Sequence, residues 1–104
     1  MEFKDILYEV KDDYAHVTIN RPKVLNAFTP VTLQELKTAL DNAEKDKNVG
    51  VIVLSGAGDR AFCAGGDMNW ESSKEFQDHE YEFHIHLTKC SKPIIAKVDG
   101  YAIG

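Results

Sequence analysis

The sequence predicts an α/β fold with the element order ββαβαβ. Three observations predict it: two segments near the N-terminus alternate apolar and polar residues, two later segments are short runs of buried type, and a segment with apolar residues at helical spacing precedes each of those runs. Helices that alternate with buried strands are typical of an α/β domain.

The first two elements are expected to form a β-hairpin. Residues 5–10 and 14–20 alternate apolar and polar side chains, and the polar residues 11–13 lie between them. The segment Asn20-Arg21-Pro22-Lys23 follows, and its turn-forming residues end the second strand.

A helix is predicted over residues 30–46. Thr29 is a good N-cap residue, and Pro30 suits the first helical position because it needs no hydrogen-bonded N–H there. Four apolar residues then recur at helical spacing: Leu33, Leu36, Leu40 and Ala43.

The second half of the chain predicts strand, helix and strand. Residues 49–54 (VGVIVL) form a buried strand. Ser72 and Glu75 fit a capping box at the start of a helix over 72–91. Residues 93–98 (PIIAKV) form another short buried strand. The apolar residues that follow it need a cover, so we expect 104 residues to be an incomplete part of a larger domain.

Composition limits the classes of function. The chain is 43% hydrophobic and 28% charged, which is ordinary for one soluble globular domain. Its net charge of −5 and the absence of a basic patch argue against nucleic acid as a partner. No apolar run reaches membrane-spanning length, and no signal peptide is recognised. Cys63 and Cys90 form no CxxC pair, so we expect reduced thiols in a cytoplasmic protein.

The segment LSGAGDRAFCAGGD, residues 54–67, is the densest cluster of small residues in the chain. Residues 56–61 match the dinucleotide fingerprint G-x-G-x-x-A, but no helix is expected directly after them, which argues against that reading. The second half, residues 64–67, leads towards a helix. Its N–H groups suit a developing negative oxygen, or the glycines only close a turn; the residues alone leave both readings open.

Metal binding is not expected. Residues 79–84 read HExxxH, one residue longer than the HExxH zinc motif, and on a helix His79 and His84 point about 140° apart.

Three blocks together resemble the crotonase (enoyl-CoA hydratase/isomerase) superfamily. They are residues 20–28 (NRPKVLNAF), 56–67 (GAGDRAFCAGGD) and 92–104 (KPIIAKVDGYAIG), in the family's order. The resemblance implies that residues 1–104 are the N-terminal part of a crotonase-like acyl-CoA-binding domain with a spiral fold. Within this superfamily, the sequence most resembles the dihydroxynaphthoyl-CoA synthases and the alicyclic acyl-CoA hydrolases and hydratases.

The resemblance also implies a site. The Gly66 N–H would be one donor of an oxyanion hole that holds a thioester enolate. Arg21 or Lys23 would lie near the CoA phosphates, which is physically reasonable. Glu71, Glu75 and Glu80 could reach the acyl pocket. The residues implied in substrate and CoA binding are Lys23, Val24, Leu25, Ala27, Ala64, Gly65, Gly66, Asp67 and Met68.

The family's further properties follow as expectations. The CoA thioester is the substrate, no separate cofactor is needed, and a full-length member would be a homotrimer or hexamer. Gly104 is the first residue of the family's three-glycine run, so the second oxyanion donor and the acid/base groups would lie beyond it. We therefore expect no turnover from these 104 residues. A non-catalytic CoA-ester-binding or assembly role is the alternative.

Overall fold

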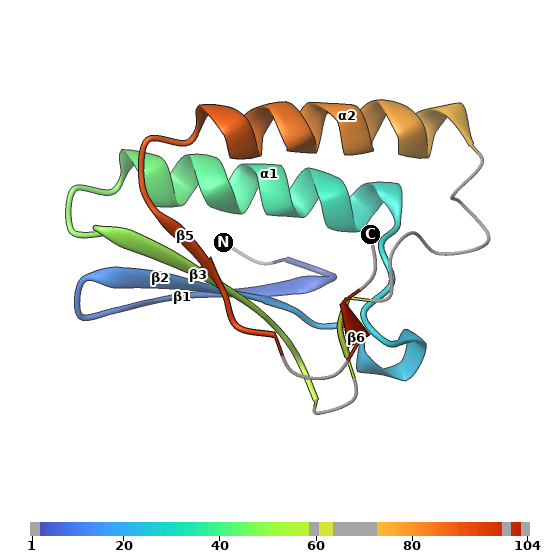
Figure 1. The fold of residues 1–104 in the computed structure, drawn as a ribbon, viewed down its shortest axis with the longest axis horizontal. Coiled ribbons are helices and arrows are strands. Elements are labelled where there is room, and N and C mark those ends of the chain that lie inside the picture. The colour runs from blue at the N-terminus through green and yellow to red at the C-terminus, as the bar shows by residue number, and fades with distance from the viewer. Residues whose placement is uncertain (1–2, 59–60, 64–72, 99–100, 103–104) are drawn as a thin grey trace.

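The computed structural model of the chain describes residues 3–58, 61–63, 73–98 and 101–102. Two helices lie side by side on one face of a four-stranded sheet, and a two-stranded ribbon lies at one end of it (Figure 1). The elements are β1 (Ile6–Lys11), β2 (Tyr14–Ile19), the 3₁₀ turn η1 (Pro22–Val24), α1 (Pro30–Lys45), β3 (Val51–Gly56), β4 (Ala61–Cys63), α2 (Lys74–Lys89), β5 (Ile94–Ala96) and β6 (Tyr101–Ala102).

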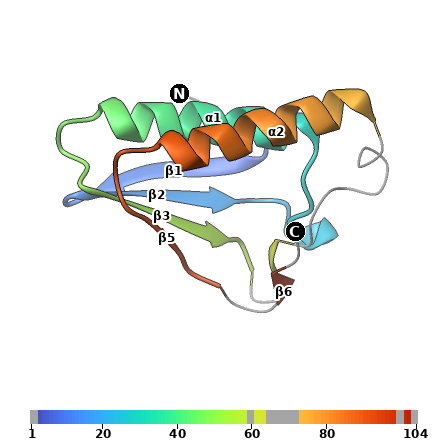
Figure 2. The same cartoon turned by 45° about the horizontal axis from the view of Figure 1, so that its top comes forward.

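The main sheet has the strand order β1-β2-β3-β5 (Figure 2). β1 and β2 pair antiparallel, as the predicted hairpin requires, whereas β2 pairs with β3 and β3 pairs with β5 in parallel. The carboxyl ends of three strands therefore meet at one edge of the sheet. The predicted α/β class and the ββαβαβ order of the main elements are confirmed.

The core lies between the sheet and the helices. β2 alternates strictly, with Ala15, Val17 and Ile19 buried and the residues between them half-buried. All four apolar residues predicted for the first helix are buried in α1, and α2 adds Phe76 and Phe83. Apolar residues that alternate with period two thus identify the buried face of a strand, and apolar residues spaced by about 3.6 identify the buried face of a helix.

Both helices begin at a capped residue. The Thr29 hydroxyl accepts the Thr32 N–H at 3.2 Å, and the Thr32 hydroxyl accepts the Thr29 N–H at 3.1 Å. Thr29 and Pro30 are therefore the N-cap and first residue of α1, as predicted. The expected start of the second helix is wrong, because Ser73 is the cap and its hydroxyl accepts the Phe76 N–H at 3.0 Å. α2 accordingly spans 74–89 rather than 72–91.

Two strands differ from the prediction. β3 begins at residue 51 rather than 49, because the Gly50 N–H donates to the Asp13 carbonyl at 2.7 Å and pairing with β2 begins only at Val51. β5 is three residues long and is not a buried strand: Ile95 is 55% exposed. β3 is the neighbour of β5 among the described strands, so one edge of β5 is left open. The sequence patterns did not predict η1, β4 or β6.

Contacts with α1 hold the middle of α2 and the segment that leaves it. The Ser91 N–H and hydroxyl both donate to the Glu44 carboxylate, at 3.0 and 2.9 Å, and these bonds lower the pKa of Glu44. Lys37 pairs with Glu82 and lowers the pKa of that carboxyl too. Cys90, at the C-cap of α2, is a free thiol, as expected.

Acid is expected to weaken this attachment. A carboxyl whose pKa is lowered by folding stabilises the protein above its ordinary value of 4.5, and that contribution is lost as the pH falls through the lower folded value. Urea midpoints measured at pH 7 and pH 3.5 should therefore differ less for Glu44→Gln than for the unsubstituted chain. Equal pH losses in both proteins would contradict the assignment of this contact.

Candidate functional site

The candidate site lies where β2 and β3 end. Ile19 and Gly56, the last residues of the two strands, are paired in register. The turn of residues 21–27 leaves β2, and the glycine-rich segment leaves β3. Ligands of parallel α/β sheets bind beside the carboxyl ends of the strands, so this edge is the first place to look for a site.

The turn after β2 is a 3₁₀ turn closed by two left-handed residues. Leu25 has φ 55° and Asn26 has φ 58°. The Asn26 N–H donates to the Arg21 carbonyl at 2.8 Å and closes the turn. Asparagine tolerates this conformation better than most residues, whereas a branched aliphatic such as leucine reaches it at a cost.

Asn26 fastens the two loops together. Its side chain is fully buried, at 0% exposure. The Oδ1 atom accepts the Arg21 N–H at 2.8 Å, and the Nδ2 atom donates to the Ala57 carbonyl at 3.1 Å. The Ala57 N–H in turn donates to the Ile19 carbonyl at 2.8 Å. Asn26 and Ala57, 31 residues apart in the sequence, are thus held in fixed positions at one edge.

The first half of the glycine-rich segment has a structural role. Gly58 has φ 81°, and a Cβ placed there would lie 3.5 Å from the Cβ of Pro22. The positive φ, more than the space, makes glycine the suitable residue. The next described element is the strand β4, not a helix. A dinucleotide fingerprint needs its helix at that point, so the structure argues against that reading.

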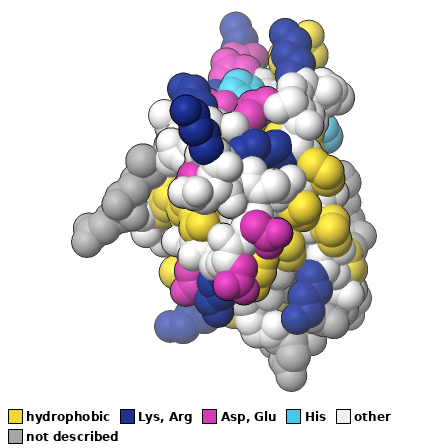
Figure 3. Space-filling view, turned by 90° about the vertical axis from the view of Figure 1, so that its left-hand side faces the viewer, with side chains coloured by type: hydrophobic (Ala, Val, Ile, Leu, Met, Phe, Trp, Pro, Cys, Tyr) yellow, Lys and Arg dark blue, Asp and Glu magenta, His cyan; other side chains and the backbone are white. Residues whose placement is uncertain are grey.

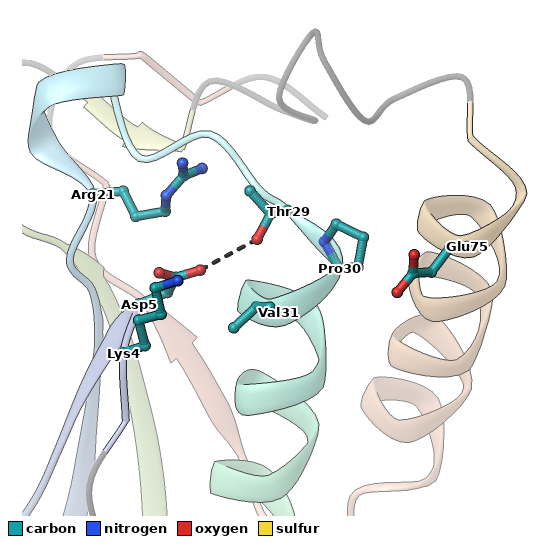
Figure 4. A pocket seen from close by; sticks show the side chains of 7 residues that line it. All are labelled: Lys4, Asp5, Arg21, Thr29, Pro30, Val31 and Glu75. Atoms are coloured by element: carbon teal, nitrogen blue, oxygen red, sulfur yellow. Dashed lines mark hydrogen bonds between the residues drawn. The ribbon is translucent and has the colours of Figure 1, made fainter.

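Two adjoining cavities open beside this turn. One has a volume of about 300 Å³ and is lined by the residues before β1, by Arg21 after β2, by the start of α1 and by Glu75 of α2 (Figure 4). The other has a volume of about 420 Å³ and extends over η1. The three residues common to both linings are Lys4, Asp5 and Arg21.

Only some of the turn residues that were predicted to bind substrate line these cavities. Lys23 and Val24 are exposed and line the larger one. Leu25 is half-buried, and Ala27 is 7% exposed and contributes its carbonyl, which accepts a hydrogen bond from the Arg21 guanidinium.

The glycine-rich half of the predicted site lies outside the described residues. This applies to Ala64, Gly65, Gly66, Asp67 and Met68, and also to Glu71. Of the other two glutamates expected near the acyl pocket, Glu75 lines the smaller cavity, whereas Glu80 is in neither lining.

Asp5 is a site residue that the sequence patterns did not single out. The residue is 8% exposed, and its Oδ2 atom accepts the Thr32 hydroxyl at 2.7 Å and the Thr29 hydroxyl at 3.3 Å (Figure 4). The backbone N–H groups of Lys4 and Asp5 each donate to the Glu35 carboxylate at 2.7 Å. The start of β1 is therefore tied to the first turns of α1.

At the opposite end of the sheet, where the parallel strands begin, cations and anions are interspersed on the surface (Figure 3). Within the described ranges, no group of three His, Cys, Asp or Glu side chains is arranged to hold a metal ion. Neither α1 nor α2 is long and apolar enough to cross a membrane.

Comparisons with known proteins agree on one family. The family model described as enoyl-CoA hydratase/isomerase matches residues 9–104. An enoyl-CoA hydratase/isomerase from Xanthobacter autotrophicus Py2 is 30% identical with a TM-score of 0.86, over 95% of this chain and 40% of that one. A probable enoyl-CoA hydratase from Mycobacterium thermoresistibile is 37% identical with a TM-score of 0.80, over 92% and 41%.

A third structure, of a Pseudomonas aeruginosa protein, is 30% identical with a TM-score of 0.90, over 100% of this chain and 48% of that one. The chain thus spans less than half the length of each of these three structures.

Proposed function

Because the chain belongs to the enoyl-CoA hydratase/isomerase family, we propose that it binds a CoA thioester at the carboxyl edge of β2 and β3. The observation that carries the proposal is the Asn26 side chain, which holds the turn after β2 against Ala57. The turn of residues 21–27 and the start of the glycine-rich segment are therefore held beside one another. The cavity over η1 supplies the space.

The proposed chemistry is stabilisation of a thioester enolate. The Gly66 N–H donates to the thioester oxygen as negative charge develops on it. A fixed backbone donor stabilises that charge without reorganisation, which is why such donors have large effects on rate. Lys23, exposed on η1, offers its charge to the CoA phosphates. In the whole protein this enolate would serve hydration or isomerisation of an enoyl-CoA.

The 104 residues alone are proposed to bind without turnover. By the resemblance, the second oxyanion donor and the acid/base groups fall at positions after Gly104. A non-catalytic CoA-ester-binding or assembly role of these 104 residues is the second candidate, and it differs from the first in predicting no hydration of an enoyl-CoA.

Three finer expectations are also proposals. The GAGDRAFCAGGD and NAFTP segments support a dihydroxynaphthoyl-CoA synthase or a ring-cleaving acyl-CoA hydrolase as the specific activity. A trimeric or hexameric assembly is proposed from the family resemblance. A cytoplasmic location is proposed because the two cysteines form no CxxC pair.

Calorimetric titration tests the binding proposal. Butyryl-CoA should bind the mass-verified chain. NADH at the same concentration should not, because the strand β4 stands where a dinucleotide site needs a helix. Crotonyl-CoA should bind and stay unhydrated. Preference for NADH would contradict the proposed ligand, and hydration of crotonyl-CoA would contradict the proposed lack of turnover.

A further inference from the structure

The two cavities beside η1 differ in charge although they share a wall. Among the described residues, the smaller one is lined by two cations, Lys4 and Arg21, and by two anions, Asp5 and Glu75. The described lining of the larger one lacks Glu75 and includes Lys23, so three cations face one anion there. On a chain with a net charge of −5, this is a local excess of positive charge. It favours an anionic ligand in the larger cavity.

Asp5, the one anion in the described lining of the larger cavity, is already hydrogen-bonded. The Asp5 carboxylate is buried and accepts hydrogen bonds from two hydroxyls of α1. Lys4 and Lys23 are exposed, and among the described residues no carboxylate forms an ion pair with either of them. Both ammonium groups are therefore open to a ligand.

Lys4 is brought to the cavity by the fold and not by its place in the sequence. The Asn20 N–H donates to the Asp5 carbonyl at 2.8 Å, so the start of β1 lies against the end of β2. The Lys4 N–H is fixed by the Glu35 carboxylate at 2.7 Å. The backbone of Lys4 is thus held in place while its side chain stays free to turn towards the cavity.

We infer that Lys4 is a third phosphate-binding residue, which joins Arg21 and Lys23 in holding the phosphate-bearing end of CoA in the larger cavity. The inference rests on the proposed function and deepens it, because it says where the nucleotide end of the ligand lies. Phosphates are commonly bound by cations drawn from separate elements, and a volume of about 420 Å³ accommodates such a group.

The test compares CoA with pantetheine, which lacks every phosphate. Dissociation constants are measured by calorimetry for the unsubstituted chain, Lys4→Ala, Lys4→Arg and Lys47→Ala. Lys47 is an exposed lysine in the connection between α1 and β3, so it matches the loss of charge away from the cavity. Replacing the Lys4 side chain leaves its backbone bond to Glu35 in place, and far-UV circular dichroism checks that each variant is folded.

Lys4→Ala is expected to weaken CoA binding about threefold to tenfold, the effect of losing one partly exposed contact to a phosphate. Pantetheine binding should not change, and Lys4→Arg and Lys47→Ala should bind CoA as the unsubstituted chain does. Unchanged CoA binding by Lys4→Ala, or an equal loss in Lys47→Ala, would overturn the inference while the proposed function stands. Failure of the unsubstituted chain to bind CoA would overturn both.

Discussion

Replacing Asn26 with alanine is expected to lower the free energy of unfolding by about 3 kcal/mol. The substitution removes the side chain that pairs with the Arg21 N–H and the Ala57 carbonyl, at a position where Asn26 itself is 0% exposed. Each unsatisfied buried group costs about 1–3 kcal/mol. Alanine also tolerates a φ of 58° less well than asparagine. Urea unfolding followed by far-UV circular dichroism measures the difference.

Asn48→Ala is the matched control. Asn48 is exposed in the connection that follows α1, so its loss should change the free energy of unfolding by less than about 0.5 kcal/mol. If Asn26→Ala were as mild as this control, the side chain would not be what fastens the turn of residues 21–27 to the segment after β3.

The second large effect is expected for Asp5→Ala, which should cost about 2 kcal/mol of unfolding free energy. The variant removes the shared acceptor of the Thr29 and Thr32 hydroxyls at the start of α1. Hydrogen bonds to a charged acceptor are worth more than neutral ones, and this acceptor is 8% exposed. The measurement is again a urea unfolding curve.

Two further variants separate the hydrogen bonds from the charge. Asp5→Asn keeps an acceptor oxygen and should lose less than half as much as Asp5→Ala. Asp13→Ala, in the exposed turn of the hairpin, should be nearly neutral. A loss from Asp5→Asn equal to that from Asp5→Ala would show that the negative charge, rather than the hydrogen bonds, stabilises this edge.

Much of the fold could be predicted from the sequence because periodicity reports burial. The inward faces of β2 and α1 follow from alternation and from helical spacing, and Thr29-Pro30 marks the start of α1. The boundaries of β3 and α2 could not be predicted in the same way. They depend on a backbone bond from Gly50 to Asp13 and on a choice between two adjacent serines. A single residue changes the helix or strand pattern of the sequence too little to fix such a boundary.

The candidate site could be predicted only as separate blocks. The turn at Lys23 and the glycines after β3 were recognisable from the residues, but the side chain that joins them was not. Asparagine in a turn is common, and nothing in its sequence neighbourhood shows that its Nδ2 atom reaches Ala57. Lys4 and Asp5 were missed for a related reason, because pairing of β1 with β2 brings them to the site.

The central claim is that the turn of residues 21–27 and the glycine-rich segment form one binding site for a CoA thioester. Titration of ¹⁵N-labelled chain with butyryl-CoA, followed by amide NMR, tests it most directly. We expect the amide signals of Lys23, Val24, Leu25 and Gly66 to shift together along one binding curve, while those of the β1–β2 turn at residues 12–13 stay in place. Shifts confined to that turn or to α2, or none at saturating ligand, would contradict the single CoA thioester site.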